Sequence, residues 1–88
     1  MNGLERLAKA LFELSDDDTI EQEKIEKVNV AIEKLSASDK TIILKRYGID
    51  QERQYTLEEV ANELGTTREA IRLREVKLYN LLKNEMTK

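Results

Sequence analysis

Basic side chains gather near the end of the chain. The segment from Arg68 to Lys83 holds five basic and two acidic residues, so its local net charge is +3. Guanidinium and ammonium groups neutralise phosphates, and a guanidinium can also pair with the edge of guanine. The chemistry indicated by this segment is therefore nucleic-acid binding. Its charged residues are Arg68, Glu69, Arg72, Arg74, Glu75, Lys77 and Lys83.

Catalytic and metal chemistry have no comparable support. The sequence has no Cys and no His, which excludes thiolate and imidazole catalysis, the usual zinc sites and disulfides. No spacing of the remaining polar residues offers a nucleophile with a base, or a metal cage. We expect a protein that is not an enzyme, with no catalytic residue, no metal site, no cofactor and no small-molecule substrate.

The overall charge of −3 is unfavourable for a protein that binds phosphates, but the charge is unevenly distributed. Residues 1–30 carry four basic and eight acidic side chains, whereas residues 31–88 carry eleven basic and ten acidic ones. We therefore expect an acidic, amphipathic N-terminal helical segment over residues 1–30. A separate DNA-binding domain is expected over residues 31–88.

Composition favours an all-α fold. The chain is rich in Leu, Ile, Glu and Lys, and it has no Pro, three Gly and only four aromatic residues. Its apolar runs are far too short for a membrane span, and its first residues do not resemble a signal peptide. A soluble protein in the reducing cytoplasm fits these features.

Two amphipathic helices are expected in the N-terminal segment. Leucines at helical spacing predict a first helix from Gly3 to Ser15, which the polar run 16–19 ends. Asp18 and Glu21 have the spacing of a capping box that opens a second helix ending near Ser36. The apolar stripes consist of Leu4, Leu7, Leu11 and Leu14, and of Ile25, Val28, Ile32 and Leu35.

These stripes share one seven-residue phase, which raises the question of a coiled coil. Two heptads on each side are fewer than a stable coiled coil needs, so we favour packing within the chain. Weak self-association through the N-terminal helices is the alternative.

Three closely spaced helices are predicted to follow, giving a small bundle of about five helices. Ser38 is the predicted N-cap of a helix that runs to Tyr47 and ends at Gly48. Thr56 and Glu59 form a capping box for a helix to Leu64, which Gly65 ends. Thr66 with Glu69 predicts a further capping box, for a last helix to about Asn84.

The stretch from Leu57 to Arg74 has the spacing of a helix-turn-helix. Ala61 is small where the two helices would cross, Gly65 suits a turn that needs positive φ, and Ile71 would pack back on the first helix. An ordinary helical hairpin has a similar pattern. We favour DNA binding because both helices carry threonine caps and the second is basic.

The last helix has two faces. Ile71, Leu78 and Leu82 lie on one side, which predicts a buried face. On the other side, Arg72 could pair with guanine, Glu69 could accept from cytosine, and Leu73 or Val76 could touch a thymine methyl group. A solvated face with pairs between neighbouring charges is the alternative.

Three segments together carry a family resemblance. Tyr47-Gly48-Ile49, Thr56-Leu57-Glu58-Glu59-Val60-Ala61 and Thr67-Arg68-Glu69-Ala70-Ile71-Arg72 resemble region four of primary-type bacterial sigma factors in order and spacing. The resemblance covers about residues 30–83. It implies recognition of the upstream (−35) element of double-stranded promoter DNA, and docking on the flap of the RNA polymerase β subunit. The implied DNA-binding residues are Arg46, Thr67, Arg68, Glu69, Arg72, Leu73 and Lys77.

The sequence also departs from that pattern. Ala70 stands where the family usually has Arg, and Leu73 where it has Gln, so two polar DNA contacts are absent. Arg74 replaces an apolar residue, and Leu44 is shifted by one position, which predicts that Leu44 and Leu73 are exposed. We favour local repacking, with Arg74 extending its guanidinium to water, over a new partner surface. Residues 1–30 resemble no other sigma-factor region.

Three functions remain open at this point. The leading one is a transcription protein that binds promoter DNA and RNA polymerase. The second is a mimic of region four that binds polymerase or a sigma factor and has weak DNA binding. The third is a repressor that dimerises through its N-terminal helices.

Overall fold

A computed structural model describes residues 2–87 as five α-helices. These are α1 (Gly3–Leu11), α2 (Gln22–Glu33), α3 (Ala37–Tyr47), α4 (Leu57–Leu64) and α5 (Arg68–Met86). No strand occurs in the described range. The expected all-α bundle of about five helices is confirmed.

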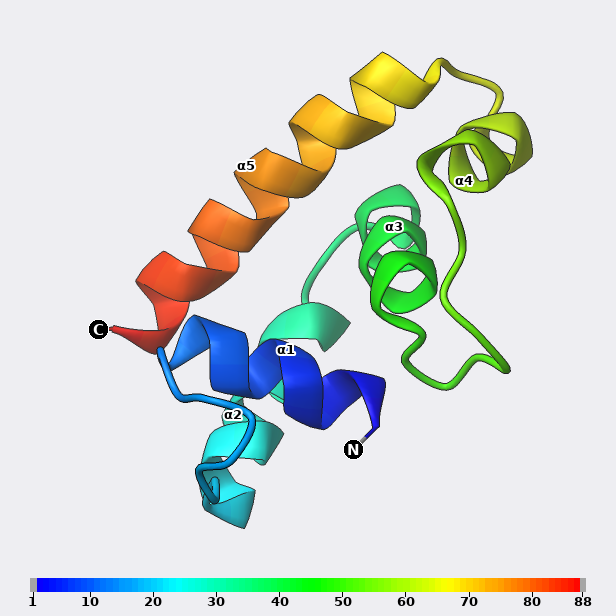
Figure 1. Cartoon of the computed structure of the whole chain (residues 1–88). Coiled ribbons are helices and arrows are strands. Elements are labelled where there is room, and N and C mark those ends of the chain that lie inside the picture. The colour runs from blue at the N-terminus through cyan, green and yellow to red at the C-terminus, as the bar shows by residue number, and fades with distance from the viewer. Residues whose placement is uncertain (1, 88) are drawn as a thin grey trace.

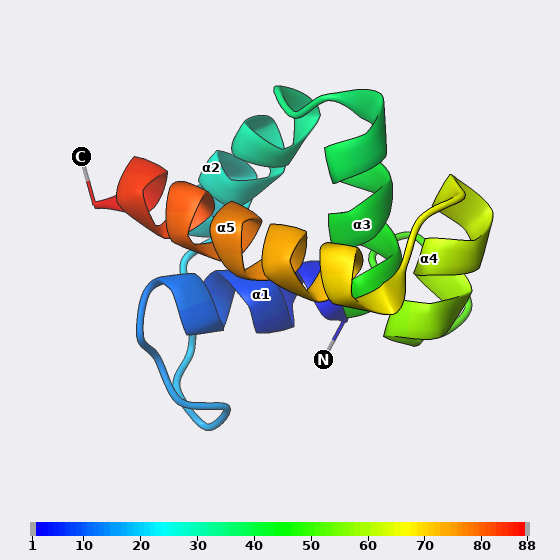
Figure 2. The ribbon, with the colours of Figure 1, turned by 90° about the horizontal axis from the view of Figure 1, so that it is seen from above.

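Helix α5 is the central element, because it packs against each of the other four helices. Figure 1 shows α4 beside the N-terminal end of α5, and α1 and α2 towards its C-terminal end. The view from above in Figure 2 shows α3 between these two groups. One half of α5 therefore belongs to the helix-turn-helix, and the other half anchors the N-terminal helices.

A single apolar core joins all five helices. Leu7 and Leu11 of α1 and Val28 and Ile32 of α2 are at most 1% exposed. The central side chains of both N-terminal stripes therefore pack within the chain, as predicted, whereas Leu14 does not join the core. The core runs across residue 30 without a break, and it is completed by Ala8, Ala31, Ile42, Ile43, Ile49, Val60, Ala61, Ile71, Leu78, Leu82 and Met86.

Two helix boundaries in the N-terminal segment differ from the prediction. Helix α1 ends at Leu11, because Glu13 adopts a left-handed conformation (φ 59°) and the chain turns away before Ser15. The predicted capping box of Asp18 is wrong. Its carboxylate accepts a hydrogen bond from the amide of Ser15 at 2.8 Å, closing a local turn, and α2 begins without a side-chain cap after Glu21.

Two predicted N-caps are also misplaced. Ser36, not Ser38, caps α3 by accepting from the amide of Asp39. Thr67, not Thr66, caps α5 by accepting from the amide of Ala70 at 3.2 Å. The amide of Thr66 instead bonds to the carbonyl of Ala61 at 2.9 Å, which completes the end of α4.

Gly48 and Gly65 end α3 and α4 with φ of 67° and 68°, as the sequence predicts. Gly3 has a different role that the sequence did not indicate. A Cβ added there would lie 2.2 Å from the carbonyl oxygen of Tyr47. The first turn of α1 therefore rests directly on the end of α3.

Candidate nucleic-acid interface

Helices α4 and α5 form the predicted helix-turn-helix. Val60, Ala61 and Ile71 are buried together, at 0%, 2% and 3% exposure. The small side chain of Ala61 permits the close crossing, and Gly65 makes the turn between the helices. The spacing that singled out these positions therefore corresponds to a real helix pair.

The two faces of α5 are divided as predicted. Ile71, Leu78 and Leu82 are at most 3% exposed and attach the helix to the core. The opposite face is open to solvent along its first three turns. We call this surface the exposed face of α5; it consists of Glu69, Arg72, Leu73, Val76, Lys77 and Asn80.

The model of one protein family, sigma-70 region 4, matches residues 31–83. The chain belongs to the sigma-70 region 4 family. No curated protein and no solved structure matches it. Membership supports a transcription-related role in DNA binding, because region 4 is a DNA-binding, non-enzymatic domain. Helix α1 and most of α2 lie outside the matched range.

Arg72 and Glu69 of this region 4 form a bidentate ion pair, with guanidinium nitrogens 2.9 and 2.8 Å from the carboxylate oxygens. The hydrogen bonds and charge of Arg72 hold the pKa of Glu69 below its usual value, and Glu69 raises the pKa of Arg72. Both side chains remain more than half exposed. The two residues that the sequence predicted to contact bases are therefore paired with each other in the free protein.

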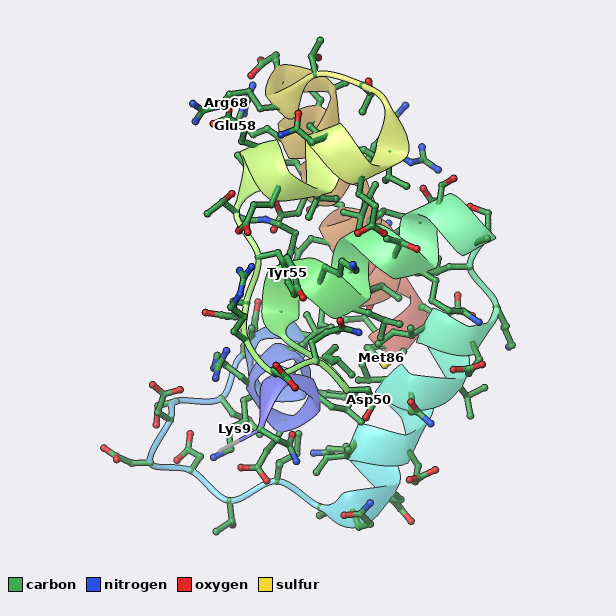
Figure 3. All side chains as sticks on the ribbon, turned by 90° about the vertical axis from the view of Figure 1, so that its right-hand side faces the viewer. Lys9, Asp50, Tyr55, Glu58, Arg68 and Met86 are labelled. Carbon is green, nitrogen blue, oxygen red and sulfur yellow. The ribbon has the colours of Figure 1, made fainter. Side chains whose placement is uncertain are left out.

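Arg68 and Lys77 have no salt bridge within residues 2–87, and both are exposed. Arg68 lies at the first turn of α5, next to Glu58 at the start of α4 (Figure 3). It shares a shallow surface hollow with Arg46, Thr56 and Leu57. Arg46 of α3 and Arg68 of α5 therefore lie near each other at the N-terminal end of α4.

Arg46 ties three elements of region 4 together. Its Nε donates to the carboxylate of Glu75 on α5 at 3.0 Å, and one terminal nitrogen donates to the carbonyl of Tyr55 at 2.7 Å. The side chain is 26% exposed, so part of it still reaches the surface. Arg46 therefore positions α4 and α5, in addition to lining the hollow beside Arg68.

The N-termini of α4 and α5 both have amide groups without a hydrogen-bond partner among the described residues. The side chains of Thr56 and Thr67 satisfy only the third amide of each helix. Within the described chain, the amides of Leu57 and Arg68 have no hydrogen-bond partner. Such helix ends bind phosphate readily. The sequence did not place Thr56 and Leu57 beside Arg46 and Arg68, although the capping box indicated that a helix begins here.

A cluster of side chains fixes the loop before α4. Two cations lie over the ring of Tyr55: Lys45 Nζ is 4.7 Å from its centroid, and the guanidinium carbon of Arg53 is 4.0 Å from it. Arg53 also pairs with Glu59 through two hydrogen bonds of 3.0 and 2.7 Å. Arg53 and the capping amide of Thr56 lower the pKa of Glu59 to about 2. No local pattern in the sequence indicates this cluster, because the loop between α3 and α4 brings its residues together.

The departures from the family pattern have different outcomes. Arg74 reaches Asp39 of α3 through two hydrogen bonds of 2.9 and 2.6 Å, so its guanidinium extends to a carboxylate and not only to water. Arg74 lowers the pKa of Asp39. Leu44 packs against the core, so its predicted exposure is wrong, whereas Leu73 is 55% exposed as expected.

The same described residues bear on two other features, a metal site and a membrane span. They contain no group of three or more acidic side chains arranged to hold a metal ion. No helix among them is long and apolar enough to span a bilayer.

Proposed function

We propose that this region 4 protein binds the −35 element of promoter DNA, with the N-terminal half of α5 in the major groove, and docks on the flap of the RNA polymerase β subunit. The observation that carries the proposal is the exposed face of α5, which stands clear of every other helix beside two open helix N-termini. Such a protein would work in the cytoplasm, where the chromosome and polymerase are.

In this proposal the predicted residues divide into two groups. Arg72 pairs with guanine and Glu69 accepts from cytosine, once their mutual pair has opened. Arg68 and Lys77, which have no partner among the described residues, contact phosphates. Arg46 and Thr67 support the backbone contacts at the two helix N-termini.

A selection experiment tests this function. Duplexes bound by the 88-residue chain are selected from a random pool, with and without RNA polymerase, and their affinities are measured. We expect one preferred sequence and tighter retention with polymerase. Arg72→Ala should weaken binding to that sequence between about fivefold and about 150-fold. Arg6→Ala, an exposed position on α1, is the control and should bind like the parent.

One observation favours a second candidate, a region 4 mimic that binds polymerase or a sigma factor and has weak DNA binding. Several cations around the interface are already paired with carboxylates, namely Lys45, Arg46, Arg53, Arg72 and Arg74. Few cations are then left to neutralise phosphates. A steep fall of log affinity with log salt supports DNA binding, and a flat dependence supports the mimic.

The dimeric repressor has less support from the structure. The central side chains of its supposed seam, Leu7, Leu11, Val28 and Ile32, are buried within one chain. A monomer in sedimentation at micromolar concentration would leave no twofold symmetry to match a palindrome.

A further inference from the structure

Two large apolar side chains lie in the middle of the exposed face of α5. Leu73 is 55% exposed and Val76 is 51% exposed. They line a shallow hollow on this helix with Ala70, and the cationic side chains of Arg72, Arg74 and Lys77 surround it. Neither Leu73 nor Val76 belongs to the apolar core of the protein.

The surroundings of this apolar strip indicate what covers it. Both side chains keep about half of their surface in water, so a partner that covered them would gain the free energy of burying that apolar surface. Of the surrounding cations, Arg72 and Arg74 are paired with Glu69 and Asp39, whereas Lys77 has no salt bridge within residues 2–87 and favours an anionic partner. The major groove of DNA has phosphates along both edges, and thymine presents an apolar 5-methyl group on its floor.

The spacing of the two side chains also suits a duplex. Along a helix with a rise of 1.5 Å per residue, Leu73 lies about 7.5 Å beyond Arg68, within the part of α5 that the proposed function puts in the groove. Leu73 and Val76 are separated by about 4.5 Å along the axis, close to the step of about 3.4 Å between neighbouring base pairs.

We propose that Leu73 and Val76 contact the 5-methyl groups of neighbouring thymines, so that this protein selects a thymine-containing step under the second turn of α5. The inference rests on the proposed function, because it requires α5 to enter the major groove. Such contacts would give the protein a sequence preference even though the side chains of Leu73 and Val76 cannot form a hydrogen bond with a base.

Replacing thymine by uracil in the DNA removes the methyl group alone, which makes the test specific. The sequence selected from a random duplex pool is resynthesised with deoxyuridine at each thymine in turn. We expect about a fourfold loss of affinity at each contacted thymine, the equivalent of burying one CH2 group. In Leu73→Ala or Val76→Ala the loss at the corresponding thymine should disappear, as a double-mutant cycle between protein and DNA requires.

Leu81→Ala is the matched control, because Leu81 is 53% exposed on the same helix and lies about 12 Å beyond Leu73. It should keep the parent's affinity and its sensitivity to uracil. The inference fails, and the proposed function stands, if a preferred sequence is found but uracil changes nothing at any position. It also fails if Leu73→Ala weakens only the retention of RNA polymerase, which would assign the strip to a protein partner. Failure to select any duplex sequence would overturn the proposed function itself.

Discussion

Replacing Glu69 by glutamine removes the negative charge that pairs with Arg72 on the exposed face of α5. In the parent, Glu69 holds the guanidinium of Arg72 through hydrogen bonds of 2.9 and 2.8 Å. Arg72 must leave this carboxylate to contact DNA, and the carboxylate itself repels phosphates. Glu69→Gln keeps the size of the side chain and removes both effects.

The size of the effect follows from the exposure of the pair. Arg72 is 51% and Glu69 62% exposed, and a pair of this kind three residues apart on a helix changes an equilibrium by about twofold. The affinity of Glu69→Gln for a duplex of random sequence should therefore rise by at least about twofold. If the released Arg72 neutralises one more phosphate, the slope of log affinity against log salt should steepen by about 0.9.

Preference for the selected sequence should fall at the same time, because glutamine accepts from cytosine through one neutral oxygen, which is a weaker acceptor than a carboxylate. Fluorescence anisotropy with the selected and a scrambled duplex, across a salt series, measures all three quantities. Glu13→Gln is the matched control, since it breaks another exposed pair of 2.8 Å, with Lys83 near the far end of α5. Unchanged random-duplex affinity and salt slope in Glu69→Gln would show that this face does not meet DNA.

Three further predictions concern the fold that carries the interface. Gly3→Ala should lower the free energy of unfolding, measured by urea titration, by about 1–3 kcal/mol, because its Cβ would lie 2.2 Å from the Tyr47 carbonyl oxygen. A neutral result would contradict the close packing of α1 on α3. Leu82→Ala should cost about 2–5 kcal/mol in the same assay, since Leu82 is 1% exposed, and an effect below 1 kcal/mol would contradict that burial. The carboxyl of Glu59 should titrate at about pH 2 by NMR, and Arg53→Gln should raise its pKa towards 4.5. Because this pKa is lowered by folding, its contribution to stability should be complete above about pH 4.5 and be lost as the pH falls to about 2.

The sequence predicted the parts of the fold that depend on local patterns. The glycines at 48 and 65 and the apolar spacing of Ile71, Leu78 and Leu82 were sufficient to place the helix-turn-helix and the buried side of α5. It misplaced caps where two candidates stood close together. Thr66 and Thr67 are equivalent by residue type, and the hydrogen bond that ends α4 decides between them.

The interactions that the sequence did not indicate are those between distant positions. Arg46 and Glu75 are 29 residues apart, and Arg74 and Asp39 are 35 apart. No local pattern marks such pairs, because they depend on how α3 crosses α5. The predicted solvent exposure of Leu44 failed for the same reason, since its burial is decided by the helices that surround it.

The net charge of −3 is compatible with binding to phosphates because the acidic run of residues 16–18 lies far from the first turn of α5. Lys9 holds the acidic loop by donating to the carbonyl of Asp16, and Figure 3 shows Lys9 at the end opposite Arg68. The longest dimension of the chain is 37 Å, whereas charges in physiological salt are screened over about 8 Å. The acidic loop therefore contributes little to the potential at the first turn of α5. Under those conditions we expect the potential at this surface to depend on nearby charges, among them Arg68 and Lys77, which have no salt bridge within residues 2–87.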